Sequence, residues 1–286
     1  MNERKKSYFY SLTQNIMKKR LLIASAAVII LCISLTGHEF WIQPGLTHIV
    51  VGQRIPLELT IGENFTGERW QGKGNKVQAY THYFRNESEE LLLSLEPGEG
   101  IVDLPDFIPR TEGTHMLTLA THNNYIEMPA NEFEDYLKED GLMAAFNYRN
   151  DHNEKQKIGR ERYRRCAKVL IQVGDDVDHT YRKETNLILD IIPLKNPYTH
   201  AKEDGLTFRV LYEGYPLPDA MVKWWRKDAD SVETDFLFTS EKGDVTFSAA
   251  TPGLYMISVV HMIRLNNDPG ADWQSTWSSL VFGIEE

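Results

Sequence analysis

Short apolar stretches alternate with polar residues along most of the chain, and turn residues separate one stretch from the next. Residues 55–61, 76–84 and 114–122 show this alternation, with glycine, proline or asparagine between them. A two-residue period places successive side chains on opposite faces of a strand, and strands at this spacing are typical of antiparallel sandwiches. The sequence therefore predicts an all-β fold.

One segment follows a different period. Residues 131–148 carry apolar side chains three and four positions apart, including Phe133, Tyr136 and Leu137. That spacing places them on one face of an α-helix. Asn131 stands at the start, where its side chain can cap the first free amides. We expect one inserted helix here.

The polar segment 174–185 divides the alternating pattern into two parts, and we interpret it as a linker between domains. The first part, residues 38–174, predicts an N-terminal β-sandwich domain that contains the helix near 131–148. The second part, residues 186–286, predicts a C-terminal β-sandwich domain. Its turns and its Gly253-Leu254-Tyr255 strand resemble those of Ig-like or prealbumin-like modules, which describes a fold and not an activity.

The N-terminal region has the order of a secretory signal peptide. Lys18-Lys19-Arg20 precedes an apolar run over residues 21–35, and small residues follow up to Gly37, where cleavage is expected. A start at Met17 gives a better-proportioned signal peptide than a start at Met1 does. The apolar run is shorter than the roughly 20 residues that a membrane-spanning helix needs. We predict that residues 1–37 are a signal peptide, that the protein is periplasmic, and that no membrane span remains after cleavage.

Cleavage after Gly37 would make His38 the first residue of the mature protein. Its free α-amine and its imidazole would then form a two-nitrogen chelate on a single residue, which suits copper, nickel or zinc. An uncleaved leader, or cleavage one or two residues away, would remove this chelate. The metal chemistry of His38 therefore depends on one processing step.

The nine histidines form no HxH or HxxxH pattern, so a metal site would have to be assembled from separate strands. His82 and His122 lie on strands predicted for the first domain, and His261 ends the Gly-x-Tyr strand of the second. With His38 they are the candidate metal ligands, although a single histidine on a strand is more often a hydrogen-bonded surface residue. A chelate with one more imidazole suits Cu(II), and a further carboxylate or imidazole suits nickel or zinc.

The formal net charge is −10, and the predicted leader carries more basic than acidic residues. An acidic surface argues against nucleic-acid binding, which depends on Lys and Arg at phosphates, and it is compatible with binding of cations. Cys166 is the one cysteine outside the predicted leader, so the mature chain can form no intramolecular disulfide. A lone cysteine is more often a small buried apolar residue than a reactive thiol.

Two further segments each allow two interpretations. The basic run around Arg160 and Arg162 could bind an anion, or it could form ion pairs with Asp272 and other carboxylates of the same chain; we favour the ion pairs. Trp273 and Trp277 could form an exposed platform for a sugar, or they could pack in the core, which is the commoner role.

The sequence contains no GxSxG elbow, no HExxH pattern, no Walker loop and no glycine-rich dinucleotide turn. Paired carboxylates are present, such as Glu89-Glu90, but they lie in expected loops and turns, where a solvated charge pair is ordinary. We therefore predict that the protein is not an enzyme.

Six segments of the chain carry a family resemblance and occur in that family's order: His38-Glu39-Phe40-Trp41, Gly62-Glu63-Asn64-Phe65-Thr66-Gly67, Tyr136-Leu137-Lys138-Glu139-Asp140-Gly141-Leu142, Arg160-Glu161-Arg162-Tyr163, His261-Met262 and Ala271-Asp272-Trp273. Together they resemble one family of exported bacterial proteins, the domain of unknown function family numbered 4198. That family is described as a NikM-like periplasmic component of ABC-type cobalt or nickel transport. Arg164-Arg165-Cys166 departs from it, because an aromatic residue is often found in that stretch.

The resemblance implies a nickel or cobalt ligand and a membrane metal transporter as partner, whereas the N-terminal histidine favours copper. We therefore expect an exported periplasmic protein that binds a transition metal ion or delivers it to an uptake system. The alternative is a non-catalytic extracellular Ig-like module that binds glycan or protein, and a third reading is a structural domain without ligand. Metal-dependent stabilisation would favour the first, because a ligand that binds only the native state raises its stability.

Overall fold

The computed structural model describes residues 38–95, 100–199, 205–248 and 251–285. The predicted signal peptide lies outside the described residues. Residues from Gly37 to the C-terminus form one compact unit. Among the described residues, no helix is both long enough and apolar enough to cross a membrane.

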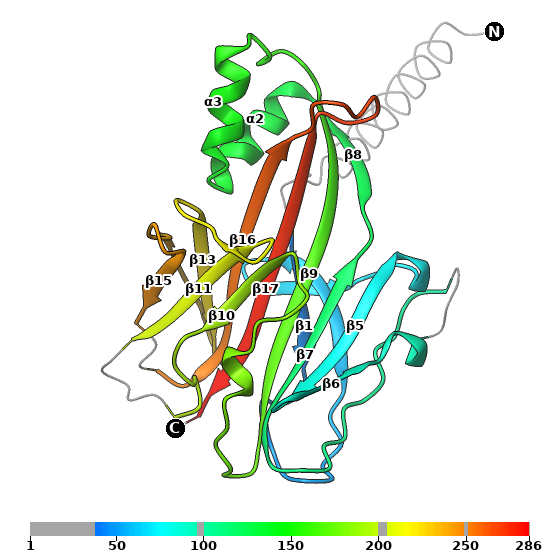
Figure 1. The fold of residues 1–286 in the computed structure, drawn as a ribbon, viewed down its shortest axis with the longest axis vertical. Coiled ribbons are helices and arrows are strands. Elements are labelled where there is room, and N and C mark those ends of the chain that lie inside the picture. The colour runs from blue at the N-terminus through cyan, green and yellow to red at the C-terminus, as the bar shows by residue number, and fades with distance from the viewer. Residues whose placement is uncertain (1–37, 96–99, 200–204, 249–250, 286) are drawn as a thin grey trace, which may run out of the picture. The chain divides into compact units, whose positions relative to one another are not determined.

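One large sheet of ten strands organises this unit (Figure 1). Most of its strands pair antiparallel, but β17 runs parallel to β9. Two short strands, β2 (His48–Ile49) and β8 (Asn124–Met128), also pair with β9. The order of the other eight across the sheet is β14 (Val232–Phe238), β13 (Met221–Lys227), β16 (Gly253–Arg264), β17 (Trp273–Ile284), β9 (Gly159–Val173), β7 (Gly113–Thr121), β5 (Val77–Phe84) and β6 (Glu87–Glu90).

Two smaller sheets complete the structure. One contains β1 (Glu39–Pro44), β3 (Leu57–Glu63) and β4 (Thr66–Arg69). The other contains β10 (Leu189–Pro193), β11 (Leu206–Tyr212) and β12 (Tyr215–Pro216), and β15 (Asp244–Phe247) pairs with β11. Three short 3-10 turns lie at Gly74–Lys76, Leu92–Ser94 and Thr180–Arg182.

The two smaller sheets cover opposite faces of the large sheet. Val169 and Ile171 of β9 belong to the core that contains Trp41 of β1. Leu170, which lies between them, belongs to the core that contains Phe208 of β11. Successive side chains of a strand point to opposite faces, so both faces are buried when a sheet packs on each side. The predicted all-β sandwich fold is therefore confirmed.

The strands of the two predicted domains meet within the large sheet. β7 and β9 come from residues 38–174, β16 and β17 come from residues 186–286, and the parallel pairing of β17 with β9 joins them edge to edge. The predicted linker 174–185 connects β9 to β10 and includes the 3-10 turn at Thr180–Arg182.

Two helices occupy the region where one was predicted. α2 (Ala130–Glu139) and α3 (Met143–Asp151) are separated by Gly141, whose φ of +67° ends the first helix. The predicted cap at Asn131 is also wrong, because α2 begins one residue earlier, with Pro129 at the N-cap position and no side-chain cap. Proline suits a helix start because its missing N–H has no intrahelical acceptor there.

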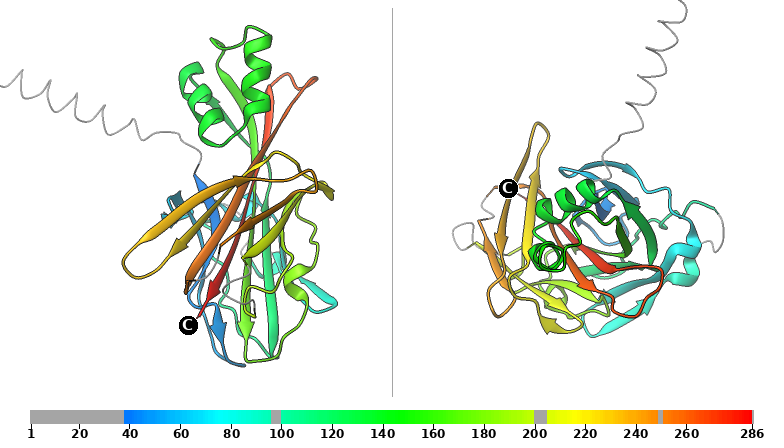
Figure 2. Two further views of the ribbon diagram at one scale, coloured as in Figure 1. Left: turned by 90° about the vertical axis from the view of Figure 1, so that its left-hand side faces the viewer. Right: turned by 90° about the horizontal axis from the view of Figure 1, so that it is seen from above.

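The helices lie at one end of the long strands β9, β16 and β17, as both views show (Figures 1 and 2). Phe133 and Leu137 of α2 pack with Met262 of β16 and Trp273 of β17 in a third core. The chain between the helices also approaches β13, because a Cβ placed on Gly141 would lie 2.6 Å from Met221 Cβ. This packing holds the polar residues of α2 and of the α2–α3 connection over the sheet.

Candidate functional site

The residue before β1 brings an imidazole to a carboxylate. β1 runs antiparallel to β3 with Glu39 paired with Gly62, and the same register places His38 opposite Glu63. His38 Nε2 lies 3.7 Å from Glu63 Oε1, and these side chains are 33% and 46% exposed. A nitrogen donor and an oxygen donor are therefore adjacent, and both can be reached from solvent.

A tight hairpin fixes the position of Glu63. Glu63 pairs with Thr66, so Asn64 and Phe65 form a two-residue turn with positive φ angles of 51° and 53°. Two positive φ angles are the signature of a type I′ turn, which asparagine tolerates and a bulky residue rarely adopts. The buried Phe65 ring packs edge-on against Trp41, with 5.5 Å between ring centroids, and this packing offsets the strain.

The two glycines of this hairpin are required by close approach. Gly62 pairs with Gly67, and a Cβ on either residue would collide with the backbone of the opposite strand. At Gly67 the added carbon would also lie 2.8 Å from the ring of Trp41. A side chain at either position would therefore displace the hairpin that carries Glu63.

Three buried carboxyl groups and one lysine, the acidic cluster, lie close to this strand end. Glu39, Asp140 and Glu161 are 5%, 4% and 2% exposed. Lys223 of β13 donates a hydrogen bond to Asp140 Oδ1 at 2.6 Å, and its Nζ lies 3.9 Å from Glu39 Oε1. The lysine thus joins the end of α2 to the start of β1.

Glu161 is held by hydroxyl groups. Its Oε1 atom accepts hydrogen bonds from Ser275 Oγ and from the Tyr136 hydroxyl, the latter at 3.4 Å. Trp277 Nε1 in turn donates to Ser275 Oγ at 3.2 Å. The other oxygen, Oε2, is buried and has no hydrogen-bond partner among the described residues.

Burial controls the protonation of the acidic cluster. Desolvation raises the pKa of Glu39 to about 7 against the opposing charge of Lys223, and it raises the pKa of Glu161 to about 7 against the hydrogen bonds from Ser275 and Tyr136. Desolvation also raises the pKa of Asp140, although Lys223 opposes the shift. For Lys223, burial lowers the pKa, but the carboxylates of Asp140 and Glu39 outweigh it and raise the pKa overall. The cluster therefore carries protons that ordinary carboxyl groups would have lost at neutral pH.

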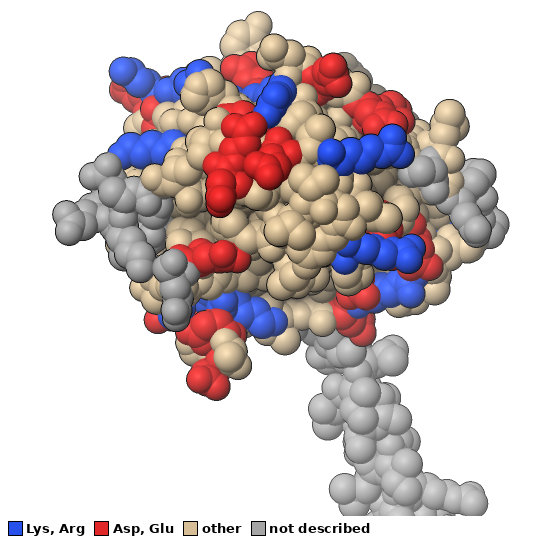
Figure 3. Space-filling view, turned by 90° about the horizontal axis from the view of Figure 1, so that it is seen from below, with Lys and Arg blue, Asp and Glu red and all other residues tan. Residues whose placement is uncertain are grey.

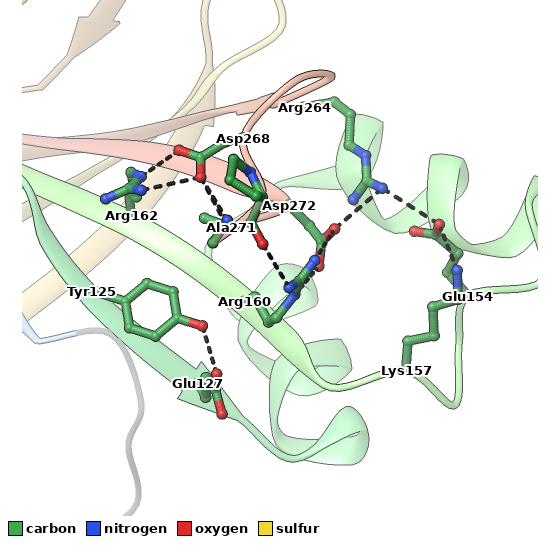
Figure 4. Close-up of polar contacts among 12 residues, drawn as sticks. Tyr125, Glu127, Glu154, Lys157, Arg160, Arg162, Arg264, Asp268, Ala271 and Asp272 are labelled. Carbon is green, nitrogen blue, oxygen red and sulfur yellow. Dashed lines mark hydrogen bonds and ion pairs between the residues drawn. The ribbon is translucent and has the colours of Figure 1, made fainter.

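The predicted basic run forms ion pairs with the β16–β17 connection (Figure 4). Arg160 makes two hydrogen bonds to the Asp272 carboxylate, at 2.9 and 3.0 Å, and Arg162 makes two to Asp268, at 2.5 and 3.0 Å. Arg264 approaches Asp272 at 3.5 Å from the other side. The predicted pairing of the run with Asp272 is confirmed, and these guanidinium groups are engaged within the chain.

Charges of both signs are intermixed elsewhere on the surface. On the face seen from below, acidic and basic side chains lie side by side with uncharged surface between them (Figure 3). Such a face differs from the continuous basic surface by which proteins track phosphates.

The other predicted histidines lie in different surroundings. His82 of β5 contacts His115 of β7, with His82 Nε2 2.9 Å from His115 Nδ1. His261 of β16 packs against the ring of Tyr212, and burial lowers its pKa. His122, just after β7, is exposed. Among the described residues no three His, Cys, Asp or Glu side chains form a group that could hold a metal, so the four predicted ligands do not converge on one site.

Two sequence alternatives are decided by burial. Trp273 and Trp277 are 2% and 8% exposed, so they pack in the core and form no platform for a sugar. Cys166 is buried, and desolvation raises the pKa of its thiol to about 11, as expected for a packed and unreactive cysteine.

Sequence reasoning missed the acidic cluster. Asp140 and Glu161 stand in segments that resemble the family, but nothing in their local sequence shows that both are buried and close enough for the charge of Asp140 to act on Glu161. Lys223 and His115 sit on ordinary alternating strands. Strand register brings His115 to His82, whereas the packing of the α2–α3 connection on β13 brings Asp140 to Lys223. The signal for this cluster that the sequence does contain is a charged residue at a strand position where the alternation expects an inward side chain.

The fold and this site define a mostly-β protein with a histidine–carboxylate pair beside a buried acidic cluster. The chain belongs to the family DUF4198, a domain of unknown function, whose model matches residues 35–263. No curated protein matches the chain.

Similarity to solved structures is low. Dimeric latent PorU from Porphyromonas gingivalis is 12% identical with a TM-score of 0.20, and the match covers 87% of this chain and 20% of that one. Three N-terminal domains of the highly immunogenic outer capsid protein of bacteriophage RB49 are 12% identical with a TM-score of 0.18, and the match covers 85% of this chain and 59% of that one. The chain therefore spans about a fifth and about three fifths of these two proteins.

Proposed function

We propose that this is an exported, non-catalytic periplasmic protein that binds a transition metal ion through His38 and delivers it to a membrane transporter. The observation that carries the proposal is the pairing of His38 with Glu63 across β1 and β3, at 3.7 Å. The hairpin places Glu63 beside His38, so the two donors already lie close together for one ion.

The donor set suits a borderline metal ion. In a mature protein that begins at His38, the α-amine and imidazole supply two nitrogens, and Glu63 supplies an oxygen. Nickel, cobalt and copper accept such mixed nitrogen and oxygen ligands. Because described side chains alone form no three-ligand group, the free α-amine is essential to this proposal.

Electrostatics favour a cation at this position. Besides burial, the neighbouring charges of Asp140 and Glu63 raise the pKa of Glu39, so negative charge is concentrated at this strand end. A bound cation would relieve this repulsion, while Lys223 offsets part of it. The open coordination positions that remain suit an ion that is handed on rather than one that is held permanently.

The test is the metal content and affinity of protein purified from periplasm with its N-terminus verified by mass spectrometry. His38→Ala and Glu63→Gln are compared with His122→Ala, a matched control because His122 is exposed and lies after β7. We expect stoichiometric nickel, cobalt or copper that is lost in His38→Ala, weakened in Glu63→Gln and retained in the control. Equal binding by wild type and His38→Ala would contradict the proposal.

A second candidate function, protein binding, is favoured by the edge strand β14. All seven residues of this strand are exposed, including Phe236, Leu237 and Phe238, which are 53%, 42% and 52% exposed. An edge strand with exposed apolar side chains can accept another strand. Phe236→Ser with Phe238→Ser should then abolish self-association or partner capture in analytical ultracentrifugation, and should leave metal binding unchanged.

A further inference from the structure

A separate cavity lies between one face of β5, β6 and β7 and the loop 105–111. Its volume is about 470 Å³, which falls in the range of sites that bind small molecules. The strand register places His82 directly opposite Glu89, so both side chains stand on the face that lines the cavity. His115 of β7 completes this wall.

Hydrogen bonds fix the tautomers of the two imidazoles. His115 Nε2 lies 3.0 Å from the carbonyl oxygen of Thr111, which can only accept, so this nitrogen carries a proton. In a neutral ring His115 Nδ1 is then an acceptor, and His82 Nε2, 2.9 Å away, donates to it. His82 Nδ1 is left with a free lone pair and has no hydrogen bond to any described residue.

The surroundings keep this chain of imidazoles neutral. Burial lowers the pKa of His82 to about 4, with His115 adding to the effect, and burial also lowers the pKa of His115. The wall of the cavity therefore presents a hydrogen-bond acceptor, and not a cation, near neutral pH.

The charged group within reach of His82 Nδ1 is a carboxylate. Directly opposite residues of an antiparallel pair have Cβ atoms about 5 Å apart, so the carboxylate of Glu89 can approach a group bound at His82 Nδ1. Two other carboxylates line the cavity: Asp106 is already paired with Arg54 at 2.5 Å, and Glu87 stands opposite Phe84. Arg110 is the one basic residue among the described residues that line the cavity.

We propose that this cavity binds a small protonated alkylamine. The ammonium group donates one hydrogen bond to His82 Nδ1 and pairs with the Glu89 carboxylate. Its alkyl part packs on Phe107, whose ring meets the His82 and His115 rings edge-on, with centroid distances of 5.6 and 5.4 Å. A metal ion fits less well, because both nitrogens of His115 are already used and no three-ligand group exists among the described residues.

The experiment is a titration of the mature protein with n-butylammonium, followed by the imidazole nitrogen signals in NMR spectra. 1-Butanol is the uncharged probe of similar shape. Glu89→Gln removes the charge, His82→Phe removes the acceptor, and Glu68→Gln, an exposed change on β4, is the matched control.

We expect saturable binding that shifts His82 Nδ1, with affinity about tenfold or more lower for 1-butanol, for Glu89→Gln and for His82→Phe, and unchanged for Glu68→Gln. Three results would overturn the proposal: no saturable shift at millimolar amine, equal affinity for 1-butanol, or undiminished binding by folded Glu89→Gln. Nickel that binds His82 and displaces the amine would assign the cavity to a metal instead, and would also overturn it.

Discussion

Replacement of Glu161 by glutamine should change how stability depends on pH. Glu161 is 2% exposed, and burial raises its pKa from 4.5 to about 7. Between these two values the folded state binds more protons than the unfolded state, so this group makes the protein less stable as pH rises from about 4.5 to about 7. Glutamine cannot ionise, and its Oε1 can still accept the hydrogen bonds from Ser275 and Tyr136.

The size of the change in unfolding free energy follows from the shift in the pKa of Glu161. Each pKa unit corresponds to about 1.4 kcal/mol, so a shift from 4.5 to about 7 is of the order of 3 kcal/mol. Glu161→Gln should therefore match wild type near pH 4 and exceed its stability by up to about 3 kcal/mol near pH 8. The raised pKa of Glu39 also lowers stability as pH rises. Because Glu39 is present in both proteins, its effect cancels in the difference between their unfolding free energies.

The assay is urea unfolding of both proteins at several pH values, in the presence of a chelator so that bound metal does not contribute. The quantity to compare is the difference in unfolding free energy between the two proteins at each pH. A difference that stays constant from about pH 5 to about pH 8 would refute the assignment of a raised pKa to Glu161.

Two other predictions concern the supports of the site. Gly67→Ala would place a methyl group 2.8 Å from the Trp41 ring, and thermal unfolding should show a loss of about 1–3 kcal/mol; an unchanged melting temperature would contradict the close packing. Lys223→Met leaves the 4% exposed Asp140 carboxylate unpaired, which should cost about 3 kcal/mol in urea unfolding, and Asp140→Asn in the same chain should restore most of it. A double variant no more stable than Lys223→Met would show that the pair does not act through charge.

The elements of the fold follow from local patterns. Alternation along β5, β7 and β16 predicts strands because successive side chains of a strand point to opposite faces of the sheet. In the structure consecutive residues of β7 and β16 are buried, because both faces of these strands are covered. The pattern could not show that β17 pairs parallel with β9, since pairing depends on long-range register. The break at Gly141 was also missed, because the apolar spacing continues across it while the backbone turns.

The site is predictable only where chemistry has a strong local signature. An arginine-rich run needs nearby carboxylates, so its pairing with Asp272 could be foreseen. Lys223 and Asp140 lie 83 residues apart, and each alone resembles an ordinary surface charge. Their meeting depends on how the α2–α3 connection packs on β13, which no spacing in the sequence encodes.

In the proposed site the free α-amine and imidazole of His38 bind the metal ion together with Glu63. The most direct test compares nickel and copper affinity, by calorimetry, of mature protein that begins at His38 and of protein in which His38 follows an uncleaved carrier. Both retain the imidazole and Glu63, and only the first has the α-amine. We expect the carrier-linked protein to bind at least about a hundredfold more weakly, and equal affinity of the two proteins would contradict a role for the α-amine.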